Sequence, residues 1–395
     1  MSEHNSSCTK VVVIGGGYAG TVAANRLRQR DDVEITVVNS RPRFVERLRL
    51  HQFVAGTGEV AIDYDTLLGA GVRLVVDDAI RIDTAAWTVE LASGRALDYD
   101  YVVYAVGSTA AVPASVPGAV EFAYPIAELE HAERLRAVIE GTSAAAITVV
   151  GAGLTGVETA AELAEQGHRV TLVCGDRLAP TFSERGRRLV ARWMARNGVE
   201  VLERMRVAQV LPDGVVLADG RVVPGTATIW TAGFGVPGLA ARSGLHTDAL
   251  GRLLTDETLT SVDDDRIVAA GDAAAPSGVP LRMSCQAAGP LGATAADTIL
   301  AGISGARPAV LDLAFLGSNV SLGRRAGIVQ FARKDDTAVN AYLGGRIGAP
   351  IKETATKWTV SGIRWEARKP GVLFWAKGGR RLEHSVSGGE VVTNP

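Results

Sequence analysis

One short pattern occurs twice in this sequence and constrains its fold more than any other feature. It consists of an apolar run, three glycines spaced Gly-x-Gly-x-x-Gly, and a helical pattern. In the first copy the apolar run is residues 10–14, the glycines are Gly15, Gly17 and Gly20, and residues 21–28 have the helical pattern. An uninterrupted apolar run of this length is typical of a strand that is buried on both faces of a parallel sheet.

The second copy repeats this order with residues 146–150, Gly151, Gly153, Gly156 and residues 157–166. A further apolar strand pattern follows each copy, at residues 33–38 and 168–173. In such a unit the first glycine makes a tight turn, the second lets the backbone approach a pyrophosphate, and the third lets helix and strand pack closely. Two complete units therefore predict an α/β protein with two Rossmann-like dinucleotide-binding domains.

The second strand of such a unit normally ends at an acid that hydrogen-bonds a ribose. Here that position is Asn39 in the first copy and Cys174 in the second. The amide of Asn39 can hydrogen-bond a ribose hydroxyl without carrying charge. In the second copy no carboxylate at position 174 repels a 2′-phosphate and Arg177 is close, although Asp176 can also reach the ribose. NADH and NADPH both remain candidates.

Composition and charge narrow the classes of protein to which this chain can belong. The 395 residues suggest two or three domains, and 47% hydrophobic with 21% charged residues is the balance of a globular protein. A net charge of −2 favours neither nucleic acid nor an anionic membrane surface. The three cysteines form no CxxC pair and no zinc pattern, so we expect no metal site. With no signal segment and no apolar stretch near the roughly 20 residues that span a bilayer, a cytoplasmic protein is expected.

Three further motifs extend the pattern beyond the glycine loops. Residues 99–108 end in Gly107-Ser108, residues 229–233 end in Gly233, and residues 267–272 end in Gly271-Asp272. With them, residues 10–312 resemble the FAD-dependent pyridine nucleotide-disulfide oxidoreductase superfamily. Within this superfamily they resemble the branch of type II NADH:quinone oxidoreductases and apoptosis-inducing-factor-like proteins.

This resemblance implies a domain order and two cofactors, FAD and either NADH or NADPH. The FAD domain would comprise residues 10–115 and 250–312, with the nicotinamide domain inserted at 116–249 and a C-terminal domain at 313–395. The positions assigned to FAD are Gly15, Gly17, Tyr18, Ala19, Gly20, Asn39, Ser40, Arg41, Arg49, Ala79, Ala105, Gly107, Gly271 and Asp272, the last of which would hold the ribityl chain. Those assigned to the nicotinamide dinucleotide are Gly151, Gly153, Leu154, Thr155, Gly156, Cys174, Arg177 and Gly233.

One departure from the family pattern concerns the redox-active cysteine pair of the disulfide reductases. The corresponding region, residues 41–52, contains no cysteine, so electrons should pass directly from the flavin to a bound acceptor. Arg47 is expected there to stabilise negative charge near the flavin. His51 could exchange a proton, since its ordinary pKa is near neutrality, or it could simply lie at the edge of the core.

Two other positions match family residues near the flavin. Glu158 matches a glutamate close to the nicotinamide, although a carboxylate near a helix start is also favoured by the helix dipole. Gln286 matches a glutamine that lines the acceptor site of quinone reductases. Its neighbour Cys285 replaces an alanine and is expected to be a small packed thiol rather than a reactive one.

The C-terminal residues 313–395 fit the family pattern least well. Trp358, Val360, Ile363 and Trp365 alternate roughly, and residues 372–375 follow a Lys-Pro-Gly turn. This pattern favours strands over an amphipathic membrane helix, and a packed domain that covers the flavin. Basic residues lie between the apolar ones, so peripheral membrane contact stays open, as does a homodimer.

The function expected from these features is FAD-dependent NAD(P)H:acceptor oxidoreduction with a quinone-like or other small-molecule electron acceptor. One alternative is a flavin-dependent tailoring dehydrogenase or oxidase with a metabolite as donor. Another is a redox-sensing flavoprotein of low turnover. A reductase of a small iron–sulfur protein would need a basic docking face, but the arginines within residues 185–196 read better as a solvated helix face.

Overall fold

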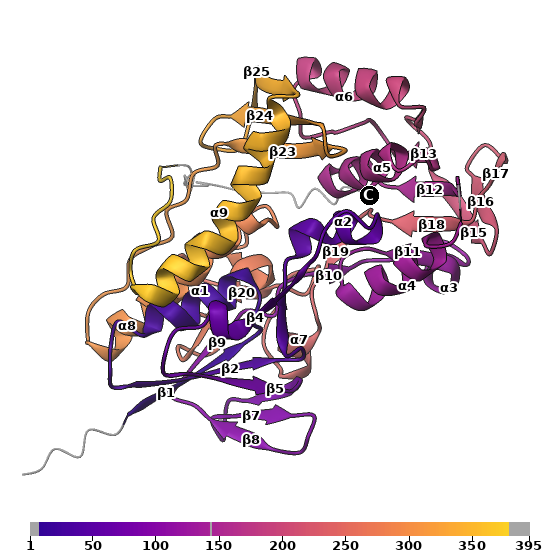
Figure 1. Cartoon of the computed structure of the whole chain (residues 1–395). Coiled ribbons are helices and arrows are strands. Elements are labelled where there is room, and N and C mark those ends of the chain that lie inside the picture. Colours follow the sequence, from indigo (N-terminus) through magenta and orange to yellow (C-terminus); the bar gives the residue numbers. More distant parts are fainter. Residues whose placement is uncertain (1–7, 143, 379–395) are drawn as a thin grey trace, which may run out of the picture.

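The computed structural model describes residues 8–142 and 144–378, in which two parallel sheets form the centres of two α/β units (Figure 1). The first sheet has the strand order β21-β9-β1-β2-β5 and every neighbouring pair is parallel. Its strands are β1 (Thr9–Ile14), β2 (Val33–Asn39), β5 (Val72–Val76), β9 (Tyr101–Tyr104) and β21 (Ile267–Ala269). The sheet therefore combines an N-terminal stretch with a strand that follows the whole second unit.

The second sheet has the order β11-β18-β12-β13-β14 and is also parallel. Its strands are β11 (Ala123–Pro125), β12 (Ala146–Val150), β13 (Arg169–Val173), β14 (Glu200–Leu202) and β18 (Ala227–Trp230). Helices α4 (Leu129–Ile139), α5 (Leu154–Glu165) and α6 (Glu184–Arg196) belong to this unit. The first unit carries α1 (Tyr18–Leu27) and α8 (Cys285–Ile303), which pack closely against each other.

The glycine patterns predicted β1, β2, β12 and β13 to within one residue, whereas helices α1 and α5 begin earlier than predicted. Helix α1 begins at Tyr18 and α5 at Leu154, three residues ahead of the expected starts, so each helix begins inside its glycine loop. The first turn of each helix therefore presents its backbone N–H groups at the loop, where an anion is favoured.

The remaining elements up to residue 276 are short. They are β3 (Arg43–Val45), η1 (Arg47–Arg49), α2 (Leu50–Val54), β4 (Ala61–Asp63), η2 (Tyr64–Thr66), β6 (Ala79–Asp83), β7 (Thr88–Leu91), β8 (Ala96–Asp98), β10 (Thr109–Ala110), α3 (Ala119–Phe122), β15 (Val207–Leu211), β16 (Gly214–Leu217), β17 (Val222–Pro224), β19 (Phe234–Gly235), α7 (Leu239–Arg242), β20 (Leu253–Thr255), η3 (Gly271–Ala273) and β22 (Ala274–Pro276). Among the described residues, no helix combines the length and the apolar content needed to cross a membrane.

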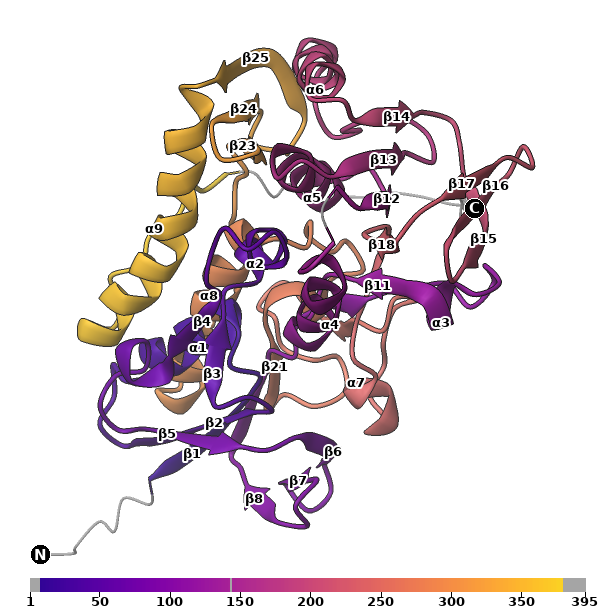
Figure 2. The ribbon, with the colours of Figure 1, turned by 45° about the vertical axis from the view of Figure 1, so that its right-hand side comes forward.

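The C-terminal segment differs from the sequence prediction. Strands β23 (Gly317–Leu322), β24 (Ala326–Ala332) and β25 (Ala338–Gly345) form an antiparallel sheet, and α9 (Gly348–Arg368) follows it. Figures 1 and 2 both show α9 running from this sheet to α1, and it packs against both.

The strands expected around residues 358–365 and 372–375 were therefore a wrong prediction. The four apolar residues lie in α9 on two opposite faces: Val360 and Ile363 are buried against the protein, while Trp358 and Trp365 are about half exposed. A helix with apolar residues on two faces imitates the alternation of a strand. Residues 372–375 have irregular backbone.

Candidate active site

The first glycine loop is shaped by close backbone packing. Gly15 has a φ of +103°, and a Cβ added there would lie 2.3 Å from the Ala105 carbonyl oxygen. A Cβ added at Gly20 would lie 1.8 Å from the Gly15 oxygen, whereas one at Gly17 would meet no atom within 4 Å. No side chain caps the N-terminus of α1. The loop therefore has one open side, beside uncapped helix amides, and this arrangement suits the pyrophosphate of FAD.

Two side chains hold this loop from behind. Asn39 Oδ1 accepts a hydrogen bond from Gly16 N at 2.9 Å, and its Nδ2 donates to Arg41 O at 2.8 Å. The Tyr64 hydroxyl donates to Gly16 O at 2.7 Å. The amide of Asn39 is thus engaged with the backbone at Gly16 and Arg41, and its contact with a ribose stays a prediction.

Several predicted cofactor residues have other partners or lie apart from the loop. Both guanidinium contacts of Arg41 to Glu130 of α4 are 2.6 Å long. Arg49 Nη2 lies 2.7 Å from Glu353 Oε1 of α9. Ser40 is exposed, and Ala79 is the first residue of β6, where it pairs with Leu91.

A second group gathers where β9 and β21 end. The Ser108 hydroxyl donates to Asp272 Oδ2 at 2.7 Å, and Arg47 Nη1 donates to Ser108 O at 2.9 Å. Gly107 and Gly271 have φ values of +71° and +69°. The structure therefore brings Arg47, Gly107, Gly271 and Asp272 together, with Ser108 between them, and the second oxygen of Asp272 can accept hydrogen bonds from sugar-like hydroxyls.

The second glycine loop repeats the geometry of the first. Gly151 has a φ of +108°, and a Cβ there would lie 2.7 Å from Thr231 Oγ1. A Cβ at Gly156 would lie 1.8 Å from Gly151 O, and one at Gly153 would meet no atom within 4 Å. Leu154 and Thr155 form the uncapped first turn of α5, and Gly233, with a φ of +87°, follows β18 nearby. This loop suits the second dinucleotide.

Cys174 lies at the end of β13 but is not a reactive thiol. Its side chain is half-buried, and burial, with a smaller contribution from Glu203, raises its pKa to about 12. Arg177 is exposed, and its Nε lies 3.8 Å from Asp176 Oδ2.

The cluster around Glu158 joins four elements in the interior. The carboxylate, on α5, accepts hydrogen bonds from Ser321 N of β23 at 3.0 Å and lies 3.0 Å from Lys352 Nζ of α9. His51 Nδ1 of α2 lies 3.9 Å from the other oxygen, and His51 Nε2 lies 3.4 Å from Ser321 Oγ. All four residues are buried.

The environment of this cluster lowers the pKa of both Glu158 and His51, for different reasons. Burial alone raises the pKa of Glu158, but the charge of Lys352, the neighbouring His51 and the Ser321 N–H outweigh it and hold the pKa below its usual range. Burial lowers the pKa of His51 to about 4, and Glu158 opposes this shift only in part. At neutral pH the cluster therefore contains an ionised Glu158 carboxylate and a neutral His51 imidazole.

The N-terminus of α8 lies beside this cluster. The Cys285 thiol is within electrostatic reach of Lys352, Asp272 and Glu158, and its burial raises its pKa to about 11. Gln286, in the first turn, accepts a hydrogen bond from Arg282 Nη2 at 3.3 Å. The α8 start thus lies between the Asp272 group and the Glu158 cluster, with the Cys285 thiol in electrostatic reach of both.

Sequence reasoning missed four residues of this site: Tyr64, Ser108, Ser321 and Lys352. Ser108 was visible in the Gly107-Ser108 motif but was not assigned a role. Lys352 could have been recognised only by placing residues 348–368 in a helix, since it then shares a face with Val360 and Ile363. Tyr64 and Ser321 carry no local signal.

Comparison with known proteins finds a family profile and relatives that match most of this chain. The profile of the pyridine nucleotide-disulphide oxidoreductase family matches residues 9–292. An NADH dehydrogenase-like protein of Mycobacterium tuberculosis is 33% identical over 324 residues, which cover 74% of this chain and 80% of the relative. A type II NADH:quinone oxidoreductase of Staphylococcus haemolyticus is 27% identical over 377 residues, covering 84% of this chain and 92% of the relative.

Solved structures share the fold over most of the chain. The sulfide:quinone oxidoreductase of Aquifex aeolicus superposes with a TM-score of 0.76 at 20% identity, covering 92% of this chain and 93% of its own. NDH2 of Plasmodium falciparum, solved in complex with NADH, superposes with a TM-score of 0.76 at 14% identity, covering 91% of this chain and 97% of its own. At these identities the likeness concerns the fold.

Proposed function

Because the chain belongs to the pyridine nucleotide-disulphide oxidoreductase family, whose members are FAD-dependent enzymes that use a nicotinamide dinucleotide, we propose that it oxidises NAD(P)H and reduces a quinone-like acceptor. FAD, held by the first glycine loop and by Asp272, would supply the two-electron relay between the two substrates. The observation that carries the proposal is the buried pair of Lys352 and Glu158, on α9 and α5, which lies within electrostatic reach of Cys285 at the start of α8.

The protons needed for quinone reduction suggest a role for Lys352 and Glu158. Reduction of a quinone to a quinol consumes two electrons and two protons, and the hydride of NAD(P)H accounts for both electrons and one proton. The second proton must come from a protonated group near the acceptor. The ammonium of Lys352 can donate it, while the ionised Glu158 holds that ammonium in place and neutral His51 packs against the carboxylate.

Direct transfer from flavin to acceptor fits the cysteines of this chain. Residues 41–52 contain none, and the pKa of Cys174 and of Cys285 is raised far above neutrality by burial. A thiol with such a pKa is protonated and a poor nucleophile. A cysteine relay therefore has no suitable residue at either position.

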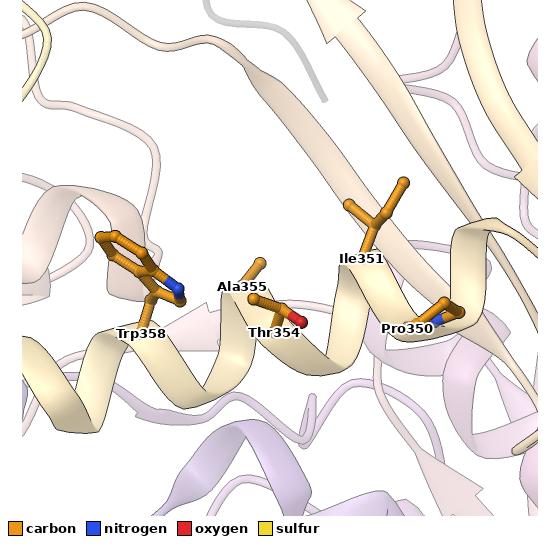
Figure 3. A pocket seen from close by; sticks show the side chains of 5 residues that line it. All are labelled: Pro350, Ile351, Thr354, Ala355 and Trp358. Atoms are coloured by element: carbon orange, nitrogen blue, oxygen red, sulfur yellow. The ribbon is translucent and has the colours of Figure 1, made fainter.

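The outer face of α9 suits a lipid surface, where a quinone would be found. Pro350, Ile351, Thr354, Ala355 and Trp358 line a shallow apolar depression of about 450 Å³ (Figure 3). Further along the helix, the ring of Trp365 lies 5.3 Å from that of Trp358. Exposed tryptophans on a helix that also carries basic residues, such as Lys357 and Arg368, are typical of interfacial membrane helices. We propose that this face contacts the membrane peripherally.

Flotation with phosphatidylcholine vesicles tests the membrane contact. Wild-type protein should float with the vesicles, and Ile351→Glu should remain in the dense fraction. Val222→Glu, on an exposed residue of β17, introduces the same charge elsewhere and should behave as wild type. Flotation of Ile351→Glu at the wild-type level would contradict this contact, and a change from dimer to monomer in that variant would instead assign the face to a homodimer.

Steady-state kinetics test the function itself. NAD(P)H oxidation with a short-chain quinone under nitrogen should show the parallel initial-rate lines of a ping-pong scheme, because a two-electron relay separates the two half-reactions. Lys352→Gln should lower turnover with the quinone more than turnover with ferricyanide, a one-electron acceptor that takes up no protons. Equal losses with both acceptors would remove the proton-donor role of Lys352, and no turnover with any quinone would overturn the proposal.

A further inference from the structure

The two loops that follow β13 and β14 are tied together by their backbones. Cys174 N donates to Leu202 O at 3.0 Å, and Gly175 N donates to Met205 O at 2.9 Å. Glu203 lies between these two acceptors in the sequence. The structure thus places a carboxylate from one strand end beside the position where the neighbouring strand lacks its acid.

Contacts of Glu203 also connect it with the second glycine loop. Its Oε1 accepts a hydrogen bond from Leu178 N at 2.7 Å, and the next amide, Ala179 N, donates to Ala152 O at 3.0 Å. Ala152 lies between Gly151 and Gly153. The influence of Glu203 on the pKa of Cys174 shows that the carboxylate is within electrostatic reach of the thiol.

The carboxylate has capacity for a ligand. The contacts of the Glu203 carboxylate with Leu178 N and, at 3.5 Å, with Arg187 Nη2 both use Oε1. Among the described residues, Oε2 has no hydrogen-bond partner, and the side chain is 46% exposed. Ionised carboxylates accept strong hydrogen bonds from hydroxyl groups.

Two of the nearby arginines, Arg177 and Arg187, already face carboxylates. Arg187 donates to Leu178 O at 3.0 Å and to Glu184 Oε2 at 3.0 Å, in addition to its contact with Glu203. Arg177 lies near Asp176 and also influences Glu184. A 2′-phosphate beside Arg177 or Arg187 would therefore approach a guanidinium group that is partly neutralised, and it would meet the free oxygen of Glu203.

We propose that Glu203 supplies, from the end of β14, the ribose-binding carboxylate that position 174 lacks, and that the second unit therefore selects NADH over NADPH. Its Oε2 accepts hydrogen bonds from the adenosine ribose hydroxyls and repels a 2′-phosphate. This inference rests on the proposed function in one respect, the assignment of the nicotinamide dinucleotide to the second unit.

The test compares binding of NAD⁺ and NADP⁺, by isothermal titration calorimetry, with kcat/KM for NADH and NADPH. Glu203→Gln keeps an oxygen that can accept from Leu178 N but removes the charge. Wild-type protein should prefer NAD⁺, and in Glu203→Gln the ratio of the two dissociation constants should shift by about tenfold toward NADP⁺. Glu200→Gln removes a charge from the same strand, where Glu200 contacts Thr171 Oγ1, and should leave the ratio unchanged.

Two results would overturn this inference while leaving the proposed function intact. They are an unchanged ratio in Glu203→Gln and a wild-type preference for NADP⁺. In both cases the dinucleotides still bind. A wild-type protein that binds neither dinucleotide would overturn the inference and the proposed function together.

Discussion

The ammonium of Lys352 lies 3.0 Å from the Glu158 carboxylate and so joins the C-terminal helix α9 to the first turns of α5, the helix that begins at the second glycine loop. Both groups are buried, and Ser321 and His51 complete the environment of the carboxylate. A helix far along the chain therefore supplies a charged group at the junction of the two nucleotide-binding units.

Removing the ammonium should leave a buried, uncompensated carboxylate. Lys352→Met should lower the free energy of unfolding by about 3 kcal/mol, and adding Glu158→Gln should restore most of that loss. Urea unfolding at pH 7.5 measures both effects. Lys357→Met on the same helix removes a largely exposed lysine that contacts Glu353 at 3.6 Å, so it should change stability by less than about 0.5 kcal/mol. A loss no larger than this for Lys352→Met would contradict the role of the pair.

His51 should make the protein acid-sensitive. Its pKa is about 4 in the folded protein, below that of an unfolded histidine near 6.5, so the unfolded state binds the proton first as the pH falls. The stability contributed by neutral His51 is complete above pH 6.5 and is lost between pH 6.5 and 4, about 2 kcal/mol of it by pH 5. Urea unfolding at pH 7 and pH 5 measures the loss, and it should be smaller by that amount in His51→Gln. An identical pH dependence in the two proteins would show that His51 titrates normally.

Substitutions at Gly17 and Gly153 should show which glycine loop binds FAD and which binds the nicotinamide dinucleotide. Gly17 and Gly153 have negative φ values, −77° and −68°, and an added Cβ meets no protein atom within 4 Å at either position. Alanine at either position should therefore leave the fold intact, but it should collide with a pyrophosphate in the loop. Gly17→Ala should lower FAD affinity by at least about tenfold, whereas Gly153→Ala should retain FAD and lose affinity for the nicotinamide dinucleotide to the same extent. Flavin content and dinucleotide titration measure both, and the reverse pattern would exchange the assignments of the two loops.

Cys285 should be dispensable for electron transfer. Burial raises the pKa of its thiol to about 11, so Cys285→Ala should keep turnover within about twofold of wild type, and alkylation by iodoacetamide at pH 8 should be slow. Rapid alkylation of Cys285 that abolishes turnover, together with an inactive Cys285→Ala, would show a thiol step.

The glycine loops could be predicted from sequence because their requirements are local. Gly15, Gly20, Gly151 and Gly156 are needed for a positive φ or for backbone approach within a few residues, and a strand and a helix flank each loop. The positions of β1, β2, β12 and β13 followed from the same pattern.

The rest of the site depends on contacts between distant segments. The amide of Asn39 holds Gly16 and Arg41, and Arg41 and Arg49 pair with Glu130 and Glu353, contacts that the sequence did not predict. The position of Lys352 depends on α9, and the alternating apolar residues of that helix led to a wrong prediction of strands. Only the packing of α9 on α1 and β24 decides which face of that helix is buried.

The most direct test of electron transfer from NADH through FAD to a quinone is an anaerobic two-step mixing experiment on the FAD-loaded protein. Addition of one equivalent of NADH should bleach the flavin absorbance near 450 nm, and subsequent addition of one equivalent of quinone should restore it fully without any added thiol. A flavin that NADH and NADPH both fail to bleach, or one that is bleached but recovers only when a disulfide substrate is supplied, would contradict direct transfer from nicotinamide through FAD to a quinone.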